Sequence, residues 1–247
     1  MKRWLLKQKQ TQLWESTPAT VNAVNILLQT GSNWLESEGK LSIQIGNKAV
    51  DTENGEAGTG YVRTAFDAKS ITPDMNRITI AKQGAGPGWG AVYGQYFEDL
   101  DKISAAKTGL NVEKSLFVEK VTGTGKTLLS VVENQPLKVG DKVIVRLVVR
   151  SDRDLEYVLL KDMRASCFEP AESLSGIRWA QQVVYYQMIR DASMNFYFYN
   201  LPKGTYVFEY PLFVNAAGEY SNGIATIQCL YAPEFVSHTS GGRVRVK

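Results

Sequence analysis

Few residues in this sequence have the types and spacing that enzyme chemistry requires. There is one histidine, His238, and it lies in a polar stretch of serine, threonine and glycine near the C-terminus. One histidine without a second ligand at metal spacing does not form a zinc site. A serine hydrolase would need a serine on a sharp turn, and no Gly-x-Ser-x-Gly occurs in the sequence. We therefore interpret His238 as a loop residue and expect neither a metal nor a cofactor.

Two glycine-rich segments resemble nucleotide-binding loops only in part. In Gly123–Thr127 the Gly-Lys-Thr end of a phosphate-binding loop is present, but its first glycine would fall on Lys120. In Gly84–Gly90 the third glycine of a dinucleotide fingerprint would fall on Trp89. Neither segment lies between a strand and a helix. We interpret the first as a hairpin turn and the second as a loop before a strand.

The sequence allows more than one role for the carboxylates and for the cysteines. The pairs Asp99/Asp101, Asp152/Asp154 and Glu169/Glu172 lie in loop or strand-end segments, and a two-carboxylate glycosidase depends on a separation in space that one sequence does not give. The two cysteines, Cys167 and Cys229, have neither metal-site nor redox spacing. They pack as buried thiols or form one disulfide between strands. No other arrangement indicates an enzyme.

The sequence contains more aromatic residues than are needed to cover one face of a strand. They belong to core packing, or they form a surface that contacts a sugar or a protein partner. The residues we select for such a surface are Trp34, Trp89, Tyr93 and Trp179; the wider set adds Tyr96, Phe97, Tyr185 and Tyr186.

Composition restricts the classes of partner. Apolar residues make up 44% of the chain and charged residues 21%, and the formal net charge is +3. No block of lysine and arginine indicates nucleic-acid binding. No apolar run approaches the roughly 20 residues that span a membrane.

The elements that would carry these residues are mostly strands. From Phe196 to Phe235, aromatic and β-branched residues alternate at period two, with Pro-Gly or Gly turns about every ten residues. Tyr206, Phe208 and Tyr210 should point to one face, and Val207 and Glu209 to the other. We predict a mostly β fold of antiparallel sandwich domains with a short helical N-terminal segment. Further strand candidates are Asn111–Thr122, Lys126–Glu133, Lys142–Val149, Glu156–Asp162, Val183–Arg190 and Arg243–Val246, whereas Glu169–Trp179 is a short helix or a loop.

The N-terminal half divides into a helical segment and a short β segment. Residues 1–31 are predicted to be helical, with Ser16 as a cap and Pro18 in the first turn. Residues 104–109 are small and polar, as in a linker. Between these segments the strand candidates are Leu41–Ile45, Tyr61–Phe66, Ile78–Lys82 and Gly90–Phe97. Four strands with one apolar face need a cover, so we expect this region to pack on a neighbouring part or on a second copy.

One family resemblance follows from these motifs. The run Leu201–Tyr210, which reads Leu-Pro-Lys-Gly-Thr-Tyr-Val-Phe-Glu-Tyr, and the closing run Ala225–Phe235 resemble the C-terminal domain of bacterial alpha-2-macroglobulins. Residues 7–24 are similar to the last helices of the thioester-type helical domain of that family. The resemblance implies three parts: 1–31 as the end of a helical domain, 32–108 as a CUB-like half sandwich, and 109–247 as a macroglobulin-type sandwich.

The resemblance also implies a function. The chain would be the non-catalytic C-terminal region of an endopeptidase inhibitor that traps target proteases at the cell envelope, in the periplasm or at the outer membrane. The family's thioester joins a cysteine to a glutamine three positions on, whereas Pro170 and Ala232 stand at those positions here. Its partners would be proteases, met through the full-length parent, and other modules of the same polypeptide. The alternative function is a cell-surface adhesion or glycan-binding module.

Overall fold

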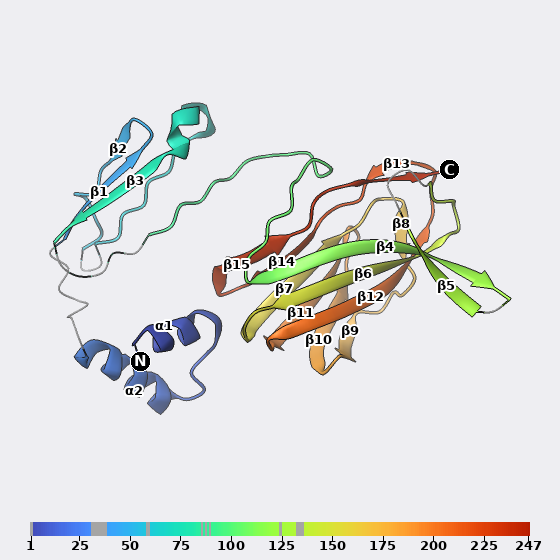
Figure 1. The fold of residues 1–247 in the computed structure, drawn as a ribbon, viewed down its shortest axis with the longest axis horizontal. Helices are drawn as coiled ribbons and strands as arrows, with labels where there is room; N and C mark the ends of the chain where they lie inside the picture. Colours follow the sequence, from blue (N-terminus) through green and yellow to red (C-terminus); the bar gives the residue numbers. More distant parts are fainter. Residues whose placement is uncertain are drawn as a thin grey trace. The chain divides into compact units, whose positions relative to one another are not determined.

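The structure is a computed structural model that describes residues 2–30, 39–57, 60–84, 86, 88, 90–123, 125–131 and 136–247. It consists of two compact units, Met1–Glu15 with Tyr96–Lys247, and Ser16–Gln95. The described chain is mostly β, with antiparallel sheets and two α-helices (Figure 1), as the sequence predicted. Each unit is described by itself.

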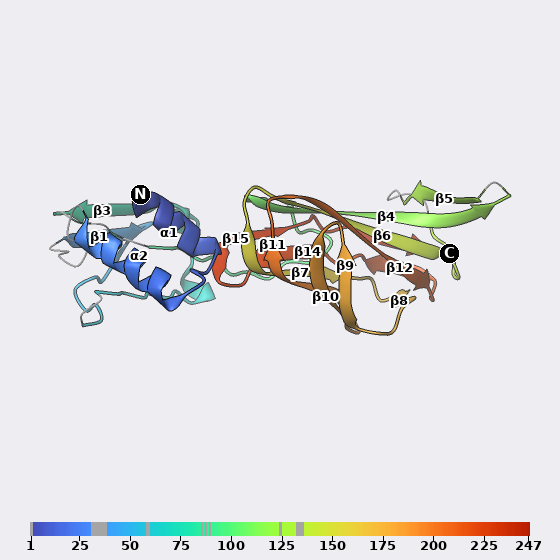
Figure 2. The ribbon, with the colours of Figure 1, turned by 90° about the horizontal axis from the view of Figure 1, so that it is seen from below.

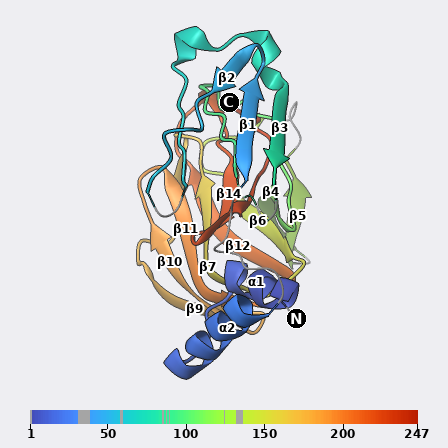
Figure 3. The same cartoon turned by 90° about the vertical axis from the view of Figure 1, so that its left-hand side faces the viewer.

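The first unit is built on two antiparallel sheets packed as a sandwich. One sheet has the order β15-β14-β7-β11-β10-β9 and the other the order β5-β4-β6-β12-β8. Figure 3 shows them as two layers, with β9, β10 and β11 in one and β4, β5 and β6 in the other. The bounds of the first sheet are β7 (Leu155–Met163), β9 (Gly176–Ala180), β10 (Val183–Ile189), β11 (Ser193–Leu201), β14 (Ala225–Cys229) and β15 (Ala232–His238).

The second sheet comprises β4 (Leu110–Thr122), β5 (Gly125–Ser130), β6 (Lys142–Ser151), β8 (Phe168–Pro170) and β12 (Gly204–Val214). A separate two-stranded sheet pairs β13 (Gly218–Ser221) with β16 (Arg243–Val246). The β4–β5 hairpin extends beyond the other strands of its sheet (Figure 2). Thr122 pairs with Gly125 across its turn, so the predicted hairpin at this glycine-rich segment is confirmed.

Strand alternation fills the interior of the sandwich. Along β12, Tyr206, Phe208 and Tyr210 are buried while Val207 and Glu209 face outward, as predicted. The ring of Phe208 lies 5.2 Å from that of Tyr185 in the opposite sheet. Burying each such side chain contributes about 1.5–3 kcal/mol, so this aromatic layer is a main source of the unit's stability.

The segment Glu169–Trp179, expected to be a short helix or a loop, contributes to β8 and β9 instead. A two-residue turn joins β9 to β10, and both of its residues, Gln181 and Gln182, have positive φ angles of 50° and 68°. Such a turn normally takes Asn-Gly. Here Gln181 Oε1 accepts a hydrogen bond of 2.7 Å from the backbone N–H of Val207, at the edge of β12. This contact holds the turn against the opposite sheet.

The geometry of the turn before β12 explains the residues of the motif Leu-Pro-x-Gly-x-Tyr. The hydroxyl of Tyr206 donates a 2.9 Å hydrogen bond to the backbone oxygen of Pro202, four residues upstream. This is the tyrosine corner found in Greek-key sandwiches. A Cβ on Gly204 would lie 3.1 Å from the Tyr206 oxygen, so glycine leaves room for the bond. The motif therefore fixes the turn into β12.

The second unit contains a three-stranded sheet of order β2-β1-β3. Its strands are β1 (Lys40–Ile45), β2 (Lys48–Val50) and β3 (Ile78–Gln83), with 3-10 turns η1 (Ala68–Ser70) and η2 (Pro73–Asn76). On one face Ile43 lies opposite Ile80 and Val50, and Ile80 remains 57% exposed. The expectation that this face needs a cover stays a prediction.

Two strand candidates of this unit are wrong and one strand was missed. Tyr61–Phe66 and the described residues 90–97 form no strand, whereas β2, only three residues long, pairs with β1. At Tyr61 the chain folds back locally, because its backbone oxygen accepts from Glu56 and Glu56 in turn accepts from Gly60. Aromatic residues favour a strand only where a neighbouring strand can take up the backbone hydrogen bonds.

The N-terminal helices agree with the sequence. They are α1 (Lys2–Thr11) and α2 (Thr17–Gln29). Ser16 caps α2, because its hydroxyl accepts from the Ala19 N–H at 3.3 Å, and proline lies in the first turn. Val21, Val24 and Leu28 of α2 are exposed. Their spacing places them along one side of the helix.

We predict that Tyr206→Phe lowers the free energy of unfolding of the sandwich unit by about 1–2 kcal/mol, because the Pro202 oxygen loses its donor. Urea unfolding monitored by fluorescence measures the effect. The control is Tyr186→Phe, an outward-facing tyrosine of β10. Equal stabilities of the two variants would contradict the corner.

Candidate functional sites

A buried ion pair joins the two sheets of the sandwich. Lys114 of β4 places its Nζ 2.7 Å from Oδ1 of Asp162 on β7, and their side chains are 5% and 0% exposed. The same ammonium donates to the backbone oxygens of Met163 at 2.6 Å and Asn222 at 3.2 Å. Tyr210 of β12 donates to the other oxygen of Asp162 at 2.5 Å. Three strands thus meet at one carboxylate.

The electrostatics of this cluster follow from its burial. Loss of solvation raises the pKa of Asp162, while Lys114 and the Tyr210 hydroxyl oppose that rise. Burial and the neighbouring Asp162 raise the pKa of Tyr210 well above its ordinary value. Because solvent does not reach the carboxylate, the cluster is suited to holding the sheets together and not to acting on a substrate.

The sequence contained a signal for this cluster that the sequence analysis did not use. Leu110, Val112, Leu116 and Val118 alternate inward along β4, and Lys114 stands in the same series. A lysine at an inward strand position needs a buried partner. The partner itself, Asp162, could not be chosen from the sequence among the other carboxylates.

The sequence left two states open for the two cysteines, buried thiols or one disulfide. Cys167 and Cys229 are free thiols, both buried. Cys229 Sγ lies 3.2 Å from the backbone oxygen of Glu156, to which it donates. Burial raises the pKa of Cys167 to about 11 and also raises that of Cys229. Of the two alternatives, the structure therefore shows the buried thiols.

Of the four selected aromatic residues, the structure describes Tyr93 and Trp179. Trp34 and Trp89 lie outside the described residues. Tyr93 and Trp179 are both 78% exposed, but they belong to different compact units. Of the wider set, Tyr185 is a core residue, whereas its neighbour Tyr186 faces outward. Trp179 lies on the edge strand β9 and Tyr186 on the neighbouring strand β10.

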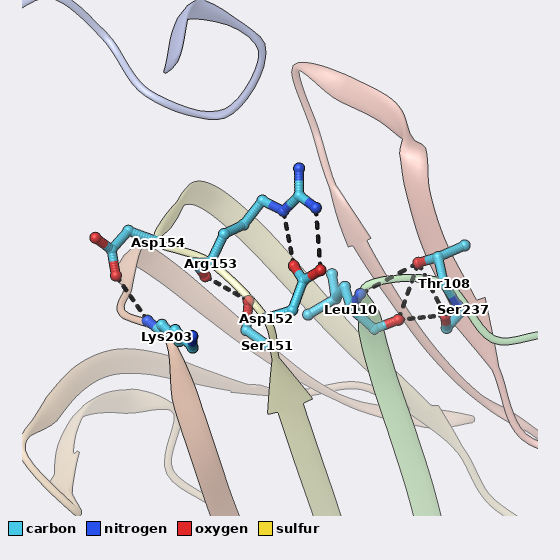
Figure 4. A network of polar contacts seen from close by, with 8 residues as sticks. All are labelled: Thr108, Leu110, Ser151, Asp152, Arg153, Asp154, Lys203 and Ser237. Atoms are coloured by element: carbon cyan, nitrogen blue, oxygen red, sulfur yellow. Dashed lines mark hydrogen bonds and ion pairs between the residues drawn. The ribbon is translucent and has the colours of Figure 1, made fainter. Parts of the chain in front are cut away.

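The segment expected to be a linker is fastened to the sandwich. Figure 4 shows Thr108 beside Ser237 of β15, where the Thr108 N–H donates to the serine hydroxyl at 2.9 Å. That hydroxyl donates in turn to the backbone oxygen of Leu110. The backbone of Asp152 donates to Gly109 at 3.0 Å, and a Cβ on Gly109 would lie 2.7 Å from the Asp152 carboxylate. The chain thus enters β4 in a fixed direction.

The adjoining loop is held by its own ion pair. Arg153 contacts both carboxylate oxygens of Asp152, at 2.7 and 3.0 Å, and the neighbouring Asp154 accepts from the backbone of Lys203 (Figure 4). The hydrogen bonds from Arg153 keep the pKa of Asp152 below its ordinary value, although some burial opposes this. The carboxylates Asp152 and Asp154, considered as an acid pair, are therefore engaged in loop contacts.

Other candidate residues show no assembled site. Within the described part of the chain, no group of three histidine, cysteine, aspartate or glutamate residues could hold a metal ion. His238 lies in β15, not in a loop, and its Nδ1 is 3.2 Å from the backbone oxygen of Thr239. No helix in the described ranges has the length and apolar character to cross a membrane.

We predict that Lys114→Met lowers the free energy of unfolding by about 3–5 kcal/mol, because Asp162 is left buried without its cation. The pKa of Asp162 should then rise further. A carboxyl whose folded pKa exceeds its unfolded pKa stabilises the fold most below the unfolded pKa, and this contribution falls as the pH rises through the folded pKa. The deficit of the variant relative to wild type should therefore shrink on acidification.

Urea unfolding at several pH values measures this deficit. The double variant Lys114→Met/Asp162→Asn, which removes both charges, should regain most of the loss at neutral pH. Lys102→Met, which breaks an exposed pair with Asp99, should leave stability nearly unchanged. A deficit that is independent of pH would show that Asp162 is not the cause.

We predict that both thiols of the folded chain resist alkylation at about pH 8 and react once the chain is unfolded, because burial blocks access and disfavours the thiolate. Mass spectrometry counts the adducts. Two adducts in denaturant without a reductant are expected. No adduct under those conditions would indicate a disulfide.

Comparison with known families gives one match. The sequence model for the bacterial alpha-2-macroglobulin MG10 domain matches residues 109–234, which is just over half of the chain. Curated proteins gave no match. The matched residues include the buried ion pair, both cysteines and the tyrosine corner.

Solved structures of longer proteins also match this chain. Trypsin-activated alpha-2-macroglobulin from Escherichia coli is 13% identical, with a TM-score of 0.50 over 98% of this chain and 16% of that one. Salmonella alpha-2-macroglobulin reacted with methylamine is 16% identical, with a TM-score of 0.47 over 59% of this chain and 10% of that one. Native E. coli alpha-2-macroglobulin, from domain MG7 to the C-terminus, is 15% identical, with a TM-score of 0.45 over 58% of this chain and 24% of that one.

This chain thus spans between 10% and 24% of the length of these solved proteins. At such identities their likeness concerns the fold alone. The family itself follows from the sequence match, which covers nearly the whole sandwich from Gly109 to Glu234. The chain belongs to the bacterial alpha-2-macroglobulin family.

Proposed function

We propose that this chain is the non-catalytic C-terminal region of an endopeptidase inhibitor that traps proteases in the periplasm or at the cell surface. The observation that carries the proposal is the family match over residues 109–234. One solved protein with this fold is an alpha-2-macroglobulin activated by trypsin. By extension, a parent of this chain would respond to proteases that cleave it elsewhere.

The sandwich is suited to act as a rigid module in such a parent. Its interior is filled by side chains from both sheets, and the Lys114–Asp162 pair links those sheets. Residues 104–109 are hydrogen-bonded to β15 and do not form a loose tether. During a rearrangement of the parent, a module of this kind moves as one rigid body, because its closely packed interior does not deform in parts.

The second unit is suited to contacts with the remaining modules. The sheet β2-β1-β3 exposes Ile80, and α2 exposes Val21, Val24 and Leu28. Apolar faces of this kind indicate missing partners. We propose that 1–31 and 32–108 are the ends of a helical domain and of a CUB-like sandwich whose other parts lie elsewhere in the parent. Self-association of the chain through the same faces is the competing expectation.

The test uses the full-length parent and trypsin. After cleavage, the parent should retain trypsin on size-exclusion chromatography and should change its hydrodynamic radius. Hydrogen exchange should change in residues 16–95, while the amides of β6, β7 and β12 keep their protection. Trypsin inactivated at its active site serves as the control. A cleaved parent that neither retains trypsin nor changes shape would refute the trapping role.

A further inference from the structure

One strand at the edge of the sandwich lacks the protection that the other edges have. Edge strands expose unpaired backbone groups, and proteins commonly cover them, shorten them, or place lysine or proline on them. At the end of β15 the backbone groups of His238 are taken up by Ala106, with both hydrogen bonds at 3.0 Å. β8 is three residues long and contains Pro170, and β5 carries the exposed Lys126. Among the described strands, β9 ends its sheet with none of these devices.

The backbone groups that β9 leaves open follow from its hairpin with β10. Both residues of the turn between the two strands have positive φ angles. In such a two-residue turn the flanking residues, here Ala180 and Val183, bond each other. Bonded and non-bonded pairs then alternate along an antiparallel ladder. Trp179 and Ile177 stand at the non-bonded positions, so their N–H and C=O groups point away from β10 and are free to bond a further strand.

The side chains of the same two residues are apolar and open to water. Ile177 is 73% exposed and Trp179 is 78% exposed. Between them, Arg178 points to the other side of the strand, where its Nη2 lies 3.3 Å from Oε2 of Glu172. Large apolar groups on an open edge strand indicate a contact with another strand.

The order of residues in β9 favours a second copy of this chain as that strand. The strand reads small, large apolar, arginine, large apolar, small: Gly176, Ile177, Arg178, Trp179 and Ala180. An antiparallel copy related by a two-fold axis at Arg178 places Ile177 beside Trp179 of the second copy, and the two small residues beside each other. Each pair of large side chains is then an apolar cross-strand contact. The edge is thus self-complementary, as a two-fold interface requires.

Charge does not oppose this arrangement. The two Arg178 side chains would face each other, which by itself would be unfavourable. Each of them already lies beside Glu172 of its own copy, so the axis would carry two positive and two negative charges. The outward residues of the neighbouring strand β10 include Val184 and Tyr186, and neither is charged. The contact therefore buries no excess of either charge.

We propose that β9 pairs with β9 of a second copy of this chain, in antiparallel register with Arg178 opposite Arg178. Ile177 of each copy would exchange both backbone hydrogen bonds with Trp179 of the other. The two six-stranded sheets would then join into one continuous sheet. This pairing does not depend on protease trapping, and it uses a different surface from the apolar faces of β2-β1-β3 and α2.

A single cysteine at the two-fold axis tests the register. Arg178→Cys places two thiols in a non-bonded pair, where the Cα atoms lie about 4.5 Å apart, a distance that a disulfide spans. The full chain with this substitution should form a covalent dimer on mild oxidation, seen by electrophoresis without a reductant. The matched control is Ala180→Cys, whose thiol would lie beside Gly176 of the second copy and should give no covalent dimer. Wild type should give none either, because Cys167 and Cys229 are buried.

Sedimentation velocity over a range of concentrations measures the association itself. Wild type should gain mass with concentration, whereas Trp179→Lys should lose this association, because it replaces apolar surface on the edge by charge. Ile177→Pro should have the same effect, since it removes an N–H that points away from β10, and proline is tolerated on edge strands. Val184→Lys changes an exposed residue of the same face on β10 and should leave association unchanged. Circular dichroism verifies that each variant is folded.

Three results would overturn the proposal. The first is that Arg178→Cys gives no more covalent dimer than Ala180→Cys. The second is that wild type stays monomeric at every concentration, or that its association survives Trp179→Lys, because the contact then lies elsewhere. The third is that Val184→Lys abolishes association as fully as Trp179→Lys, because the sheet face and not the strand edge would then be the contact.

Discussion

The structure of the sandwich depends on one constraint: every second residue of its long strands must point into a single shared interior. The neighbouring strands β6 and β12 both satisfy it. Their inward residues pair side by side in one buried layer: Val143, Val145, Leu147 and Val149 with Leu212, Tyr210, Phe208 and Tyr206. A shift by one residue would turn this layer toward water. The positions of the outward residues, including Trp179 and Tyr199, follow from that register.

Among the described residues, charged side chains reach the interior of the sandwich at one cluster. There the positive and negative charges are paired. Replacing a buried ion pair by apolar residues is often neutral or stabilising, whereas removing one partner is costly. The Lys114–Asp162 pair therefore adds little net stability. What it adds is a fixed connection between β4, β7 and β12, because both charges must be satisfied at once. Such a connection suits the proposed role of the sandwich as a module that moves as one body.

The family motif can be understood as local geometry. Gly204 leaves space for the Tyr206 hydroxyl, and that hydroxyl closes the turn at Pro202. A second glycine and tyrosine repeat the arrangement, since Tyr220 donates to Ala217 at 2.7 Å and a Cβ on Gly218 would lie 2.8 Å from the Tyr220 oxygen. Gly-x-Tyr thus recurs at the start of two strands, where the tyrosine hydroxyl closes the preceding turn.

The sequence alone determined the mostly β class, the strands with strict alternation, the capped helix at Ser16 and the family. These features depend on neighbours in the chain, so their pattern is visible without a fold. The short strands β2 and β9 depend on hairpin pairing with β1 and β10, and β8 depends on pairing with the distant strand β12. The candidate strand Tyr61–Phe66 forms local hydrogen bonds at Tyr61 instead of a ladder. Local propensity encodes none of these outcomes. The partner of Lys114 and the separate positions of the two cysteines likewise depended on the tertiary structure. Each requires residues far apart in sequence to meet, and only the packing of the two sheets sets which ones do.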